Sequence, residues 1–107
     1  MVRLFLYGTL LNPRLLASFA GRDVPLSPAT LHGWRRVVLP GTGYPTVRRA
    51  RGVVKGAVAI VNRATLARLV VYEGRRYRLT PVVIRTAQGA RAAYAWIAPG
   101  GTLRDWP

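Results

Sequence analysis

Glycine and proline residues break this chain of 107 residues into short segments, and this limits the folds that it can adopt. Apolar stretches of strand length recur, whereas only two segments carry the capping signals of a helix. Long alternating strand–helix units are absent, which argues against a doubly wound parallel sheet. We expect strands at residues 2–7, 29–39, 53–61, 76–86 and 91–97, and helices at 13–20 and 63–70. This order predicts an α+β fold, a small curved sheet or barrel with two helices packed against it.

Both expected helices begin at an asparagine. Asn12 stands before Pro13, so the asparagine can cap a helix whose first position is occupied by proline. Asn62 can cap the second helix in the same way. The other connecting segments are expected to be a loop at residues 40–45, a turn at 72–74, a hairpin connection around 88–89 and a tail from residue 100 onward.

Length and composition predict one cytoplasmic domain that covers residues 1–107. The length suffices for one hydrophobic core but not for two. No apolar stretch approaches the ~20 residues of a membrane helix, and the apolar part of the N-terminus, residues 4–7, is too short for a signal peptide. The lack of cysteine excludes a disulfide framework and permits a cytoplasmic location. Because His32 is the single histidine, we expect no metal site, and we predict no other cofactor.

The chain has a net charge of +14, and a strongly positive charge is common among nucleic-acid-binding proteins. Every basic residue except Lys55 is arginine, and the arginines are spread along the chain instead of gathering on one helical face. Distributed charge attracts phosphate without sequence preference, so we expect any binding of nucleic acid to be non-specific. A basic nucleic-acid-binding module is therefore kept only as a less favoured alternative.

Carboxylates are scarce in this chain, which contains only Glu73, Asp23 and Asp105. A carboxylate is one of the few side chains that can act as a general base near neutral pH, and Ser-His-Asp or Cys-His arrangements are poorly supplied here. Apolar and aromatic residues precede Glu73 and can raise its pKa by burial, whereas Arg75 and Arg76 follow it and favour the charged form. Two interpretations stand at this point: a catalytic carboxylate, or a structural carboxylate paired with arginine.

Four segments together resemble a known family. They are FLYGTL at 5–10, LHGWRRVVLPGTGYPTV at 31–47, VKGAVAIV at 54–61 and LARLVVYEGRRYRLTPVVI at 66–84. The gamma-glutamylcyclotransferase-like family, with its AIG2-like and gamma-glutamylamine cyclotransferase branches, has a YGSL or YGTL loop, a G-Y-P loop, a V-x-G strand and a YEG-x-x-Y-x-R segment in this order. One position departs from the family pattern, because Val70 stands where an aspartate is usual.

This resemblance implies a small mixed β-barrel with flanking helices and a pocket lined by the YGTL loop. It also implies an enzyme that releases 5-oxoproline and an amine from a small gamma-glutamyl compound, with Glu73 as the general acid/base. Backbone amides of the YGTL loop hold a substrate carboxylate in the family. The residues expected to contact the substrate are Tyr7, Gly8, Thr9, Leu10, Tyr44 and Tyr77. The alternative is a family member that keeps the pocket but has altered or lost the reaction.

Overall fold

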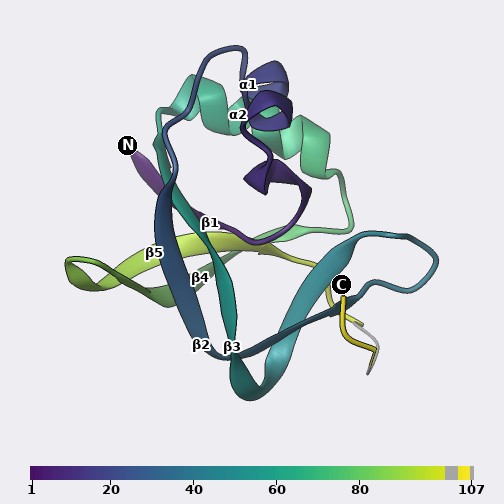
Figure 1. The fold of residues 1–107 in the computed structure, drawn as a ribbon. Coiled ribbons are helices and arrows are strands. Elements are labelled where there is room, and N and C mark those ends of the chain that lie inside the picture. Colours follow the sequence, from purple (N-terminus) through teal and green to yellow (C-terminus); the bar gives the residue numbers. More distant parts are fainter. Residues whose placement is uncertain (101–103, 107) are drawn as a thin grey trace.

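Five strands close into a mixed barrel in the computed structural model, which describes residues 1–100 and 104–106 (Figure 1). The strands neighbour one another in the order β1-β3-β2-β4-β5, and β1 closes the barrel by pairing in parallel with β5, while the other neighbours are antiparallel. They are β1 (Val2–Leu6), β2 (Ser27–Val38), β3 (Pro45–Val61), β4 (Arg78–Thr86) and β5 (Gly89–Ile97). The predicted α+β class and small mixed barrel are confirmed.

Helices α1 (Pro13–Ala20) and α2 (Arg63–Glu73) lie together against one side of the barrel, as Figure 1 shows. Both predicted caps are present, because the Asn12 side chain accepts hydrogen bonds from two amides of the first turn of α1 and Asn62 accepts one from the Thr65 amide. The caps satisfy backbone donors that have no partner inside the helix. Among the described residues, no helix has the length and apolar character needed to cross a membrane.

The end of α2 differs from the sequence-based expectation. The helix continues to Glu73, and the chain leaves it at Gly74, which has φ +76° and whose amide donates to the Val70 carbonyl at 3.2 Å. The predicted turn at residues 72–74 is therefore wrong for Tyr72 and Glu73, which belong to the last turn of the helix. Packing of α2 against the barrel extends the helix to the glycine, where a positive φ costs least.

Strand β3 is also longer than expected, since it begins at Pro45 and not at residue 53. The arginine-rich stretch 48–51 interrupts the apolar pattern, which is why the sequence did not predict a strand there. Pairing with β2 supplies backbone partners for residues 45–49, along the register from Trp34↔Arg49 to Val38↔Pro45, and the register shifts between His32 and Trp34. The loop between β2 and β3 accordingly spans residues 39–44 and not the predicted 40–45, because β2 ends at Val38 and Pro45 is already in the strand.

Strand β1 is buried on both faces and joins the two parts of the hydrophobic core. Phe5 points into the barrel, where it packs with residues such as Ile84. Leu4 points to the opposite side and packs with Leu16 of α1 and Leu69 of α2. Successive side chains of a strand face opposite sides, so an almost wholly apolar strand is suited to this central position. The end of this strand is therefore rigidly held where it turns towards the helices.

Candidate active site

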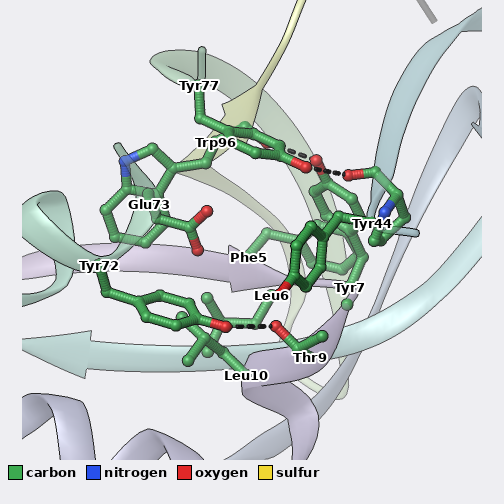
Figure 2. Close-up of a pocket in the computed structure, with 12 residues that line it drawn as sticks. Phe5, Leu6, Tyr7, Thr9, Leu10, Tyr44, Tyr72, Glu73, Tyr77 and Trp96 are labelled. Atoms are coloured by element: carbon green, nitrogen blue, oxygen red, sulfur yellow. Dashed lines mark hydrogen bonds between the residues drawn. The ribbon is translucent and has the colours of Figure 1, made fainter. Parts of the chain in front are cut away.

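A cavity of about 160 Å³ lies where the end of β1, the end of α2 and the start of β3 meet (Figure 2). Its wall includes every residue that the sequence predicted for the site: Tyr7, Gly8, Thr9, Leu10, Tyr44, Glu73 and Tyr77. Five further residues complete the wall, namely Phe5, Leu6, Pro45, Tyr72 and Trp96. The fold thus brings the predicted residues together around one space, although they come from three separate segments of the chain.

The segment after β1 forms a tight turn at the cavity. A short 3-10 helix, η1 (Thr9–Leu11), starts directly after Gly8, and its first internal hydrogen bond runs from the Leu11 amide to the Gly8 carbonyl at 3.0 Å. Gly8 lies so close to Pro45 that a Cβ atom would come within 2.9 Å of the proline Cγ. A glycine is therefore needed here for close packing and not for a positive φ, since its φ is −130°.

Glu73 extends from the last turn of α2 into the ring of aromatic residues seen in Figure 2. Burial among these residues raises the pKa of the Glu73 carboxyl from its usual 4.5 to about 7. Among residues 1–100 and 104–106, the only ion pair is Arg35–Asp105, so Glu73 has no arginine partner. The interpretation of Glu73 as an arginine-paired structural carboxylate is therefore not supported. Arg76 instead donates to the Pro40 carbonyl at 3.0 Å.

Tyrosines surround the carboxylate and are held by hydrogen bonds. The Tyr77 hydroxyl donates to the Pro45 carbonyl at 2.6 Å, and the Tyr7 hydroxyl donates to the Trp96 carbonyl. The Tyr72 and Thr9 hydroxyls are 2.8 Å apart. Burial and the nearby charge of Glu73 raise the pKa of Tyr77 to about 12, and burial also raises that of Tyr7. Both phenols stay neutral near pH 7, which leaves Glu73 as the wall residue suited to proton transfer.

Tyr44 and Val70 differ in their relation to the cavity. The Tyr44 side chain is 54% exposed and stands at the rim, in the loop between β2 and β3. Val70 is 46% exposed on α2 and is not part of the wall, so its departure from the family pattern leaves the cavity surface unchanged. Within the described part of the chain, no three potential metal ligands lie together.

Sequence reasoning did not single out Tyr72 and Trp96 as wall residues, nor Arg36 behind the wall. The Arg36 guanidinium donates to the Tyr7 carbonyl at 2.6 Å. Tyr72 adjoins Glu73 and so carried a local signal, but Trp96 and Arg36 lie on β5 and β2, far from Glu73 in sequence. Only the pairing of the strands could place them at the site.

The raised pKa of Glu73 predicts that the fold loses stability as pH rises. The folded protein holds the Glu73 proton more tightly than the unfolded chain does, so this stabilisation is complete below pH 4.5 and is lost as pH rises to about 7. Glu73→Gln is neutral at every pH and should therefore have a higher Tm than the wild type at about pH 8.5, by roughly 10 °C, with little difference at about pH 4. Calorimetry of both proteins at the two pH values measures this. Equal Tm differences at the two pH values would contradict the prediction that burial raises the pKa of Glu73.

Comparison with known proteins identifies the family of the chain and agrees with the barrel fold. The profile of the family described as gamma-glutamyl cyclotransferase, AIG2-like, matches residues 4–106. The chain belongs to this family. Protein AIG2 C of Arabidopsis thaliana is 34% identical over 99 residues, which cover 87% of this chain and 60% of that protein. Because the chain spans only about 60% of the length of this relative, the single-domain organisation of residues 1–107 stays a prediction.

Solved structures show the same fold. The solution structure of an Arabidopsis thaliana protein has a TM-score of 0.81 at 29% identity, over 91% of this chain and 61% of that one. A solved gamma-glutamyl cyclotransferase has a TM-score of 0.80 at 16% identity, over 94% of this chain and 68% of that one. At such low identity the second likeness concerns the fold alone.

Proposed function

We propose that this chain is a gamma-glutamyl cyclotransferase that releases 5-oxoproline and an amine from a small gamma-glutamyl compound, with Glu73 as the general acid/base. The observation that carries the proposal is a half-buried carboxyl with a pKa of about 7 on the wall of a small cavity, facing the Tyr7–Gly8–Thr9 turn. Family membership supports the reaction class.

The reaction places few demands on the protein, because the nucleophile belongs to the substrate. The α-amine of the gamma-glutamyl group attacks its own side-chain carbonyl, the new C–N bond closes the five-membered ring, and the old amide C–N bond breaks. Holding the substrate chain folded makes this ring closure faster through proximity. In this step the α-ammonium gives up two protons in becoming the lactam N–H, and the departing nitrogen takes up two in becoming an ammonium.

Glu73 can carry these protons one at a time. With a pKa of about 7, the carboxyl is present in both protonation states near neutral pH, so it can accept a proton from the α-ammonium and then give one to the leaving nitrogen. The surrounding aromatic side chains limit the access of water to the carboxyl. The high pKa values of Tyr7 and Tyr77 keep both phenols neutral. Because their protons are donated to the Trp96 and Pro45 carbonyls, the two phenol oxygens can orient the substrate by accepting hydrogen bonds from its α-ammonium.

The turn at Gly8, Thr9 and Leu10 is the proposed site for the α-carboxylate of the substrate. Amides at the start of a helical turn have no partner inside that turn and attract anions, and the net charge of +14 adds a favourable field. The cavity is smaller than the ~300 Å³ or more of a drug-sized pocket. Its size suits the gamma-glutamyl part of the substrate, with the leaving amine directed past Tyr44 at the rim.

Release of 5-oxoproline from a panel of gamma-glutamyl amines and dipeptides tests the proposal. We expect kcat/KM to increase as pH rises through about 7, because the first step needs the Glu73 carboxylate. Chromatographic assay of 5-oxoproline across this pH range measures the pH dependence of kcat/KM.

If no panel member yields 5-oxoproline, a family member with an altered reaction is the better interpretation. Tight binding of nucleic acid that survives physiological salt would favour the basic binding module instead. A cytoplasmic location also stays a prediction.

A further inference from the structure

We propose that Trp106 and Arg36 are positioning residues, which hold the Gly8 amide in the direction needed to bind a substrate carboxylate. The kinetic part of this inference rests on the proposed function, whereas its structural part does not. The C-terminal segment was expected to be a tail, yet its residues 104–106 contact the strand that lies behind the cavity. Three steps connect this segment to Gly8: residues 104–106 dock on β2, Trp106 holds Arg36 against the Tyr7 carbonyl, and the Tyr7–Gly8 peptide passes this orientation to the Gly8 amide.

The first contact docks residues 104–106 on the end of β2. The Val38 amide donates to the Arg104 carbonyl at 2.9 Å, and the Trp106 amide donates to the Arg36 carbonyl at 3.2 Å. The Trp106 indole N–H donates to the Gly43 carbonyl at 3.0 Å, in the loop that carries Tyr44. Trp106 is therefore fixed by both its backbone and its side chain. Its ring is held beside the Arg36 side chain.

The second contact is between Trp106 and the Arg36 guanidinium, which lies 5.4 Å from the centre of the indole ring. A guanidinium over an aromatic face is attracted by the ring and loses side-chain freedom. Arg36 is half-buried, and its Nη1 donates to the Tyr7 carbonyl at 2.6 Å. A hydrogen bond from a charged donor is stronger than one from a neutral donor, so Arg36 fixes the direction of the Tyr7 carbonyl.

The third step follows from the planarity of the Tyr7–Gly8 peptide, which is trans. In a trans peptide the C=O and the N–H point in opposite directions, so an Arg36 that holds the Tyr7 carbonyl also directs the Gly8 N–H away from itself. No described residue accepts a hydrogen bond from the Gly8 amide, and Gly8 lies on the cavity wall. The bonded carbonyl also polarises the peptide, which makes its N–H a better donor.

The neighbouring Arg35–Asp105 ion pair provides a matched control in the same segment. Its N···O distance is 2.6 Å, but both side chains are more than half exposed, at 51% and 58%. Exposed ion pairs contribute little to stability. Asp105→Asn therefore removes a contact of residues 104–106 without touching Arg36, whereas Trp106→Ala removes the ring on which the Arg36 guanidinium lies.

The experiment compares Trp106→Ala, Trp106→Phe, Arg36→Gln and Asp105→Asn with the wild type. Two-dimensional ¹⁵N NMR reports the Gly8 amide resonance, titration with 5-oxoproline reports carboxylate binding, and steady-state kinetics report KM and the pH profile. We expect Trp106→Ala and Arg36→Gln to shift the Gly8 resonance and to raise both KM and the Kd for 5-oxoproline about tenfold, the effect of one hydrogen bond to a charged group. The pH midpoint set by Glu73 should not move, since burial and not Arg36 raises its pKa.

Trp106→Phe should recover most of the wild-type values because it keeps an aromatic ring, and Asp105→Asn should match the wild type. An unchanged Gly8 resonance in Arg36→Gln would overturn the inference, as would an Asp105→Asn variant as impaired as Trp106→Ala. If Trp106→Ala does not fold, Trp106→Phe and Arg36→Gln still decide the question. If the wild type releases no 5-oxoproline, the proposed function fails, while the Gly8 resonance still tests the link from Trp106 to the turn.

Discussion

Glu73→Gln should lower turnover by about 100-fold or more, which corresponds to roughly 3 kcal/mol of transition-state stabilisation. Glutamine keeps the shape of the side chain and one acceptor oxygen, but it cannot take up a proton at working pH. Because the Glu73 carboxyl makes no ion pair within the described residues, the substitution removes proton transfer without breaking a structural contact. KM and the Kd for 5-oxoproline should change little. The assay is 5-oxoproline release under saturating substrate.

The other two carboxylates serve as controls for this prediction. Asp105 lies on the surface in its pair with Arg35, and neither it nor Asp23 lines the cavity. Asp23→Asn and Asp105→Asn should therefore both turn over at close to the wild-type rate. A Glu73→Gln variant that retained wild-type turnover would show that the carboxyl is structural, and the proposed mechanism would have to be abandoned.

Gly56→Ala should destabilise the fold by about 3 kcal/mol, at the upper end of what overpacking costs. Gly56 lies on β3 beside the end of β1, and a Cβ atom there would come within 2.2 Å of the Leu6 carbonyl oxygen and 2.8 Å of the Phe5 ring. The first of these is backbone, so β1 itself must move, and with it the turn that lines the cavity. Chemical denaturation of the variant and the wild type measures the loss.

Gly43→Ala provides the comparison, because no atom lies within 4 Å of a Cβ placed on Gly43 and its φ is not positive. Its denaturation midpoint should match that of the wild type. If Gly56→Ala were equally harmless, the close approach of β3 to β1 would not be a constraint on the barrel. The glycine of the V-x-G motif would then need another explanation.

Much of the local structure was determined by the sequence. The two asparagine caps mark where the helices begin, because their side chains satisfy amides of the first turn wherever the helix lies. The hairpin expected around residues 88–89 joins β4 to β5, with Thr86 opposite Gly89. The apolar run of β1 indicated burial on both faces. These features depend on neighbours within a few positions, so a sequence can specify them without knowledge of the fold.

Only the tertiary structure decided which residues meet at the site and which way the pKa of Glu73 is shifted. Sequence left two interpretations of Glu73, because apolar residues precede it and Arg75 and Arg76 follow it. In the fold the carboxyl turns into the cavity, while both arginines stay exposed, so burial outweighs their charge and raises the pKa. Electrostatic interactions depend on distance in space and on access to water, and position along the chain fixes neither. The same reason applies to Arg36 and Trp106, which strand pairing brings to the turn at Gly8.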